Sequence, residues 1–278
     1  MSTGPVLALA SAAAYGLSDF AGGLLARRAH FVTVALLGQA GGLVVALLAA
    51  PAFPAAPRPE SLAWGALSGV GTGVGMLFLF RGLGRGAMSV VVPVSAVGGV
   101  ALPVLAGVLL LGERPSALSW LGIAVAVPAL WLVSRTRDGT GGGAAATADG
   151  LVASVGIALQ YLALAQADPA SGIWPVVTGR VAAILTILPL LRAAHVRARL
   201  SVPTIGWAAV TGALAALALV CYLLATRQQL VVIAVVLSSL YPAIPVLLGI
   251  TVLRERLGWR QALGLVAAGA AIALLTLG

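Results

Sequence analysis

Two charged residues lie inside long apolar runs of the sequence, where the burial of a charge is unfavourable unless a partner or a polar cavity compensates it. Asp19 falls in YGLSDFAGG, and Arg180 falls near the middle of IWPVVTGRVAAILTILP. An unpaired charge in apolar surroundings is costly, so such residues usually face a partner or a polar cavity. A carboxylate there can carry a proton or bind an ammonium group, and a guanidinium can hold a carboxylate or a phosphate. Alternatively, the two residues pair with each other, or Asp19 lies near polar headgroups at a helix end.

The composition shows what surrounds these charges. Of the 278 residues, 61% are hydrophobic and 8% are charged, whereas soluble domains carry about 25% charged residues. A single soluble core could not bury so much apolar surface, so the excess is expected to face lipid. The net charge of +9 comes from arginines in the short gaps between apolar runs, a pattern typical of oriented membrane helices and not of nucleic-acid binding. Cys221 is the only cysteine, so no intrachain disulfide is expected.

Ten apolar runs are long enough to cross a bilayer, for which a helix needs about 20 residues. Backbone polar groups in lipid must bond within their own segment, so these runs are predicted to be helices. They cover residues 5–26, 31–50, 61–82, 87–111, 116–134, 150–167, 172–191, 202–225, 231–253 and 258–277. The predicted fold class is therefore an all-α integral membrane protein.

An internal repeat divides the chain into two halves. A shift of 142 residues places ALPVLAGVLLLGER (Ala101–Arg114) over AIPVLLGITVLRER (Ala243–Arg256), with eight of fourteen positions identical. The shared Pro-x-x-x-Gly-x-x-x-x-x-Glu-Arg frame makes a chance match of two apolar helices a poor explanation. We therefore predict a five-helix repeat in residues 1–137, a Gly-rich cytoplasmic linker in residues 138–149 and a second repeat in residues 150–278. Because five is odd, the second repeat is expected to be inverted in the membrane, as in many secondary transporters.

The arginines support this topology. Twelve fall on the membrane side of the first loop, three fall on the other side, and Arg180 lies within a span. The arginine-rich side holds Arg27, Arg28, Arg81, Arg85, Arg135, Arg137, Arg192, Arg197, Arg199, Arg254, Arg256 and Arg260; the other side holds Arg58, Arg114 and Arg227. The positive-inside rule makes the arginine-rich side cytoplasmic, so both termini are predicted to lie outside a cytoplasmic (inner) membrane.

With ten spans in two halves, each ending its fourth helix in Glu-Arg, the sequence resembles the EamA-type transporters of the drug/metabolite transporter superfamily. PVLAGVLLLGER (Pro103–Arg114) and PVLLGITVLRER (Pro245–Arg256) carry the resemblance, which extends over essentially the whole chain. The resemblance implies export or exchange of small metabolites, amino acids or drugs. The halves differ at one place, because the position matching Arg180 in the first half is Gly38. A charge in one half only argues against a symmetric cavity.

Paired features of the two repeats suggest structural and gating roles. Glu113 and Glu255 end matching helices and are each followed by arginine, so we expect local pairing that fixes loop geometry, with a gating role as the alternative. Proline removes a backbone hydrogen bond and kinks a helix. Matching interruptions in two halves point to a substrate path, although membrane helices also tolerate proline without a functional role. The prolines concerned are Pro93, Pro103, Pro242 and Pro245.

Polar and aromatic residues within the spans are candidates for lining a cavity, although each could instead bond one helix to another. Besides Asp19 and Arg180, they are Tyr15, Gln39, Ser95, Gln160, Tyr161, Trp174, Ser238, Ser239 and Tyr241. The GVGTGVG run from Gly69 to Gly75 lies within a span, so we predict close helix packing and not a phosphate loop. Neither His30 nor His195 has nearby acidic partners, and no metal site, catalytic residue or cofactor is predicted.

Four possible functions remain to be compared. The favoured one is a secondary transporter, an exporter or exchanger of small metabolites such as amino acids, in which Asp19 and Arg180 offer complementary charges. The second is a proton-coupled efflux pump for cationic drugs, with Asp19 as its titratable carboxylate. A membrane-embedded enzyme is disfavoured because acids and histidines do not cluster, and kinked repeat helices with buried charges argue against a scaffold. The expected partners are a small-molecule substrate and the lipid bilayer, and one chain supplies both halves, so a monomer could suffice.

Overall fold

A computed structural model describes residues 3–26, 29–84, 88–134, 144–193, 202–241, 243–251 and 258–277, and all regular elements within them are helices. The α-helices are α1 (Thr3–Ala26), α2 (Phe31–Ala49), α3 (Pro59–Gly84), α4 (Met88–Leu109), α5 (Ala117–Ser134), α6 (Ala144–Ala165), α7 (Trp174–Ala193), α8 (Val202–Thr226), α9 (Val231–Ser238), α10 (Ala243–Thr251) and α11 (Trp259–Leu277). Two short 3₁₀ turns, η1 (Ala50–Ala52) and η2 (Pro169–Ser171), follow α2 and α6. The all-α prediction is confirmed.

The predicted spans agree with these helices to within a few residues, with two exceptions. α6 begins at Ala144, inside the stretch predicted to be linker, because its AAATA start has high helix propensity. The ninth predicted span is not one helix, because α9 ends at Ser238 and α10 begins at Ala243. Residues that precede proline disfavour the α conformation, and Tyr241 and Ile244 both do so, which accounts for a break in this region.

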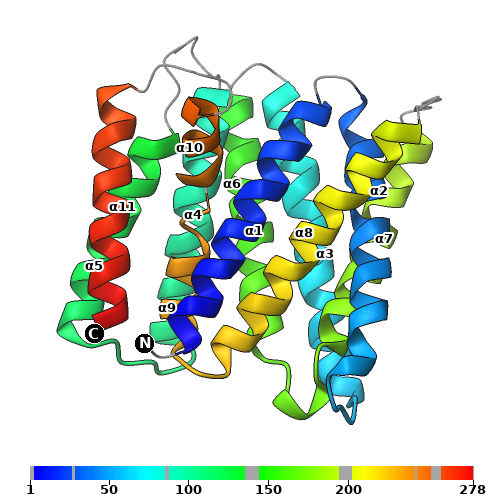
Figure 1. The fold of residues 1–278 in the computed structure, drawn as a ribbon, viewed down its shortest axis with the longest axis horizontal. Coiled ribbons are helices and arrows are strands. Elements are labelled where there is room, and N and C mark those ends of the chain that lie inside the picture. The colour runs from blue at the N-terminus through cyan, green and yellow to red at the C-terminus, as the bar shows by residue number, and fades with distance from the viewer. Residues whose placement is uncertain are drawn as a thin grey trace.

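The helices pack mainly across the two halves of the chain (Figure 1). α3 packs against α6 and α7, α8 packs against α1 and α2, and α5 pairs with α11. α4 lies against α6 and α9, and α1 also contacts α9 and α10. Both marked chain ends lie at the same edge of the bundle in Figure 1. The core therefore forms between the halves and not within each of them.

The glycine run of α3 explains its close contact with two helices. A Cβ added at Gly69 would lie 2.0 Å from the Gly179 carbonyl oxygen of α7, and one at Gly73 would lie 2.7 Å from Thr186 Cβ. A Cβ at Gly71 would instead lie 2.6 Å from the Gly156 carbonyl oxygen of α6. Glycines four residues apart lie on the same face of a helix. Gly69 and Gly73 therefore face α7, whereas Gly71 faces α6. The prediction of close helix packing at this run is confirmed.

Among the described residues, four stretches are long and apolar enough to cross a membrane by length and composition. They are Phe31–Ala52, Pro59–Leu79, Ala148–Ala165 and Val202–Thr226. Shorter apolar helical stretches are Val97–Leu109, Ala117–Leu132, Trp174–Leu190 and Ala262–Leu275. Large exposed side chains such as Leu48, Leu109 and Val266 add to an apolar outer surface, as expected for helices that face lipid.

Candidate functional site

Arg180 is the largest fully buried side chain among the described residues, with 1% of its surface exposed. It lies on α7, and its Nη1 donates a hydrogen bond to Gln39 Oε1 of α2 at 2.8 Å. Its Nε and Nη2 have no hydrogen-bond partner in the described part of the chain. A buried guanidinium with only one neutral partner is poorly compensated, so this position can accept an anion.

A set of polar contacts relates Arg180 of α7 to residues on α2, α3, α6 and α1. The Gln39 amide Nε2 approaches Met76 Sδ of α3 at 3.0 Å. One turn earlier on α3, Thr72 donates to Gln160 Oε1 of α6 at 2.6 Å. Gln160 Nε2 in turn donates to the Tyr15 hydroxyl of α1 at 2.9 Å. α3 thus joins an α2–α7 pair and an α1–α6 pair into one polar network.

All four tyrosines of the chain lie in one connected cluster beside this network. The Tyr15 ring centroid is 6.5 Å from that of Tyr161 and 6.0 Å from that of Tyr241. Tyr161 and Tyr222 are 4.6 Å apart, and the Tyr222 hydroxyl donates to the Tyr161 carbonyl oxygen at 2.9 Å. The cluster is an aromatic wall whose faces and hydroxyls could receive a cationic or planar group.

Asp19 lies one turn after Tyr15 on α1 and is exposed. Its charge acts on the hydroxyls of Tyr15 and Tyr241, and the charge of Arg180 acts on Tyr15 as well. Among the described residues, no ion pair or hydrogen bond engages the Asp19 carboxylate. The possible Asp19–Arg180 ion pair is therefore absent among the described residues, and the charges of both residues act on Tyr15.

Sequence reasoning identified most of the network but not all of it. Of the predicted cavity residues, Tyr15, Asp19, Gln39, Gln160, Tyr161, Arg180 and Tyr241 come together. Ser238 instead bonds the Ala8 carbonyl oxygen at 3.3 Å, Trp174 packs on the core at the start of α7, and Ser95 and Ser239 are buried. Thr72 and Tyr222 were missed, although Thr72 is the single hydroxyl within the glycine run and Tyr222 is a polar aromatic residue within a span.

The prolines of the two halves act differently. α4 continues through Pro93 and Pro103, and Pro103 is buried. Pro245 lies within α10, just after the break between α9 and α10, and Pro242 lies outside the described residues. The matching helices are therefore interrupted in the second half only. Tyr241, a member of the aromatic cluster, lies at this interruption.

Glu113 makes a contact that the sequence did not predict. Its Oε1 and Oε2 accept hydrogen bonds from the backbone N–H groups of Val231 (2.7 Å) and Val232 (2.9 Å) at the start of α9. A carboxylate at a helix N-terminus satisfies free N–H groups and complements the helix dipole. This cross-half cap replaces the local pairing expected for Glu113. Glu255 lies outside the described residues.

Two ion pairs connect α3 and the residue before it to the second half of the chain, one near each end of this helix. Arg58 Nη1 lies 2.8 Å from Asp168 Oδ2, next to η2, and Arg81 Nε lies 3.1 Å from Asp149 Oδ1 on α6. Close to Asp168, Arg227 Nη2 donates to the Gly172 carbonyl oxygen at 2.6 Å. Partial burial lowers the pKa of the Arg227 guanidinium, and the Asp168 carboxylate partly opposes this change.

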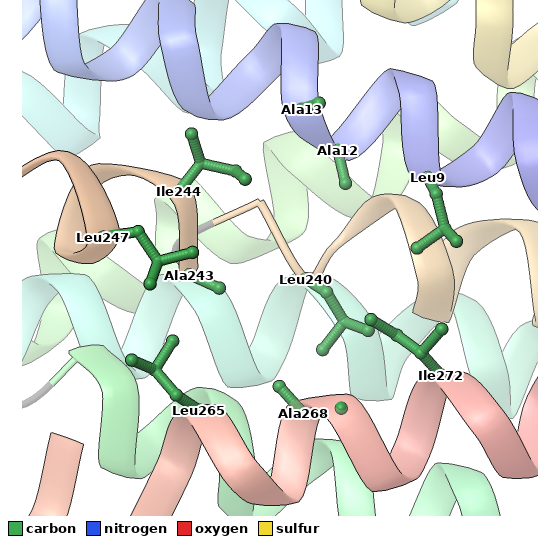
Figure 2. A pocket seen from close by; sticks show the side chains of 11 residues that line it. Leu9, Ala12, Ala13, Leu240, Ala243, Ile244, Leu247, Leu265, Ala268 and Ile272 are labelled. Carbon is green, nitrogen blue, oxygen red and sulfur yellow. The ribbon is translucent and has the colours of Figure 1, made fainter. Parts of the chain in front are cut away.

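A separate apolar groove of about 410 Å³ lies between α1, the α9–α10 break and α11 (Figure 2). Its lining is apolar throughout: Leu9, Ala12, Ala13, Leu240, Ala243, Ile244, Leu247, Leu265, Ala268, Gly269 and Ile272. Two of these residues, Leu240 and Ala243, flank the interrupted segment that carries Tyr241. The groove offers no polar chemistry of its own. No cluster of three or more metal-ligating side chains occurs within the described ranges.

Comparisons with known proteins agree with a membrane transporter fold. The EamA-like transporter family model matches residues 2–135, whereas no curated protein matches the chain. Fifteen chains of solved structures match; one crystal structure has 18% sequence identity and a TM-score of 0.75 over 99% of this chain and 96% of that chain. That likeness concerns the fold alone. Over residues 2–135, the family match confirms the resemblance to the EamA-type transporters of the drug/metabolite superfamily that was found in the sequence.

Proposed function

We propose that the chain is a secondary transporter that exports or exchanges small metabolites, such as amino acids, across the cytoplasmic (inner) membrane. Its substrate would bind at the network of Arg180, Gln39, Gln160 and Tyr15, between the two halves of the bundle. Access would alternate as helices of the two halves rock against each other.

The single observation that carries this proposal is the poorly compensated charge of Arg180. The side chain is 1% exposed, yet two of its three guanidinium nitrogens have no hydrogen-bond partner among the described residues. A purely structural arginine in apolar surroundings would be expected to have an acid or several carbonyl groups around it. An anionic group of a transported substrate would supply the missing partner.

Helix packing supports the inverted-repeat architecture on which alternating access depends. A shift of 142 takes α3 (59–84) to 201–226, the position of α8, and likewise takes α1, α2 and α5 to α6, α7 and α11. α4 goes to α9 and α10 together. Under this exchange, the contacts of α3 with α6 and α7 become those of α8 with α1 and α2, and α4–α6 becomes α1 with α9 and α10. α5–α11 and α2–α7 map onto themselves.

Uptake into proteoliposomes tests the proposal. A labelled panel of amino acids, other small metabolites and cationic drugs would be measured with and without a pH gradient. Saturable transport of a zwitterion or anion, lost in Arg180→Gln and kept in the surface variant Arg58→Gln, is the expected result. Equal transport by Arg180→Gln and the unaltered chain would contradict the proposed site.

A proton-coupled pump for cationic drugs is the alternative, and the exposed Asp19 next to two tyrosines favours it. In that case, only cations would be transported, only with a pH gradient, and Asp19→Asn would abolish coupling. Asp168→Asn, which removes a carboxylate from a surface ion pair, is the matched control. If Asp19→Asn weakens substrate affinity while uptake stays independent of the gradient, the metabolite proposal holds.

A further inference from the structure

Arg180 presents a defined edge of its guanidinium to a ligand. Nη1 is occupied by Gln39, whereas the unpartnered atoms are Nε and Nη2. These two nitrogens share one edge of the planar group, and their N–H bonds are parallel. Two parallel donors match the two oxygens of a carboxylate, which binds such an edge in a bidentate manner.

Tyr15 offers a second donor at the same polar network. Its hydroxyl oxygen accepts a hydrogen bond from Gln160 Nε2, and Gln160 Oε1 is held by Thr72, so the amide orientation is fixed from α3. A phenol has one proton to donate, and no described residue accepts the proton of Tyr15. The hydroxyl lies within electrostatic reach of the Arg180 charge.

The charge balance of the site distinguishes among anions. Arg180 is the one cation of the network within the described residues, and the chain contains no lysine. One guanidinium balances a monoanion, while a phosphate monoester carries nearly two charges, which the nearby Asp19 carboxylate repels, and more acceptor oxygens than these donors can satisfy. The donor set therefore fits a single carboxylate.

We propose that the substrate carries a carboxylate, which the Nε and Nη2 edge of Arg180 binds bidentately while the Tyr15 hydroxyl, oriented by Gln160 and Thr72, donates a third hydrogen bond. This assignment rests on the proposed transport function and adds to it the substrate class and the role of Tyr15. The site is closed in this conformation, since only 1% of the Arg180 surface is exposed. Entry of the carboxylate therefore requires the helices around Arg180 to move apart.

Thermal unfolding of the purified full chain in detergent tests this assignment, because a ligand that binds the folded state raises the melting temperature saturably. The probes are acetate and benzoate, their neutral counterparts acetamide and benzamide, and inorganic phosphate, at constant ionic strength. We expect the carboxylates alone to raise the melting temperature. Tyr15→Phe should weaken carboxylate affinity by about tenfold, since a hydrogen bond to a charged group is lost.

Two further variants test whether Thr72 acts on carboxylate binding by orienting Gln160 and Tyr15. Thr72→Val frees the Gln160 amide to turn its oxygen toward Tyr15, so it should also weaken carboxylate affinity, by about threefold, without touching the ligand. Thr226→Val removes a hydroxyl outside the network that bonds the Leu223 carbonyl oxygen, so it should leave the affinity unchanged.

Each remaining outcome overturns the assignment. These are equal stabilisation by amides and carboxylates, a preference for phosphate, unchanged affinity in Tyr15→Phe, and no saturable shift with any carboxylate. Arg180→Gln identifies which claim has failed. If carboxylate binding survives Arg180→Gln, the anion site of the proposed function is wrong; if binding is lost in Arg180→Gln but intact in Tyr15→Phe, only the role of Tyr15 is wrong.

Discussion

Gln39 is the one polar partner of Arg180 in the described structure, and both ends of its amide are engaged. Oε1 accepts from Arg180 Nη1, and Nε2 approaches Met76 Sδ. A buried charge that loses its last partner suffers the full penalty of desolvation, whereas replacing charge and partner together by apolar groups is often neutral or stabilising. Variants of Gln39 and Arg180 can therefore distinguish the role of Arg180 in transport from its effect on stability.

We predict that Gln39→Leu lowers the free energy of unfolding by about 1–3 kcal/mol, because the guanidinium is left without a hydrogen bond. The double variant Gln39→Leu/Arg180→Met should be more stable than Gln39→Leu alone, since the uncompensated charge is gone, yet it should not transport. Unfolding in detergent micelles measures the first effect, and proteoliposome uptake measures the second. A double variant that is less stable than both single variants would mean that Arg180 has a structural role.

At the scale of elements, the sequence predicted helix positions well because each span is a long apolar run with polar gaps on either side. It named prolines in both the fourth and the ninth span as kinks, but it did not distinguish the ninth span, which breaks between α9 and α10, from α4, which stays continuous. It also placed the start of α6 too late, because AAATAD has the composition of a linker. Alanine nevertheless favours helix, and Asp149 pairs with Arg81. Proline positions and alanine propensity account for these bounds once the structure is known, and only the Asp149–Arg81 pair involves a partner far away in sequence.

The candidate site was also predicted only in part, because the sequence does not show which helices pack together. Asp19 and Arg180 were identifiable because a charge within an apolar run is conspicuous, but whether they pair depends on how α1 and α7 pack. Three of the four tyrosines in the aromatic cluster were candidates from the sequence, whereas Tyr222, from the largely apolar helix α8, was missed. Glu113 was noticed through the repeat, yet its partners, the first N–H groups of α9, carry no side-chain signal at all.

The cap at α9 yields a prediction at this scale. Glu113→Gln keeps the side-chain shape but removes the charge and replaces one acceptor oxygen by an N–H donor that faces another donor. We expect a loss of about 1–2 kcal/mol in unfolding free energy and faster hydrogen exchange at Val231 and Val232. Glu60→Gln, at an exposed position in the first turn of α3, is the control and should change stability less. Unchanged exchange at α9 would show that the cap does not hold this helix.

At the scale of the whole molecule, loops of the two halves meet at one end of the bundle. The Ala56 N–H of the α2–α3 loop donates to the Ala170 carbonyl oxygen of η2 at 2.8 Å, next to the Arg58–Asp168 ion pair. His30 lies at the other end, where α2 begins (Figure 1). These three exposed positions therefore report on the sidedness of both halves.

Topology is best read with single cysteines in a Cys221→Ala background. We predict that a membrane-impermeant maleimide labels Ala56→Cys and Ala170→Cys in intact cells, because the arginine-poor side should lie outside. His30→Cys should be labelled only after the membrane is opened. The reverse pattern would keep the fold and invert the orientation in the membrane. Labelling of Ala56→Cys and Ala170→Cys from opposite sides would contradict the ten-span arrangement itself, since residues joined by a backbone hydrogen bond share one side.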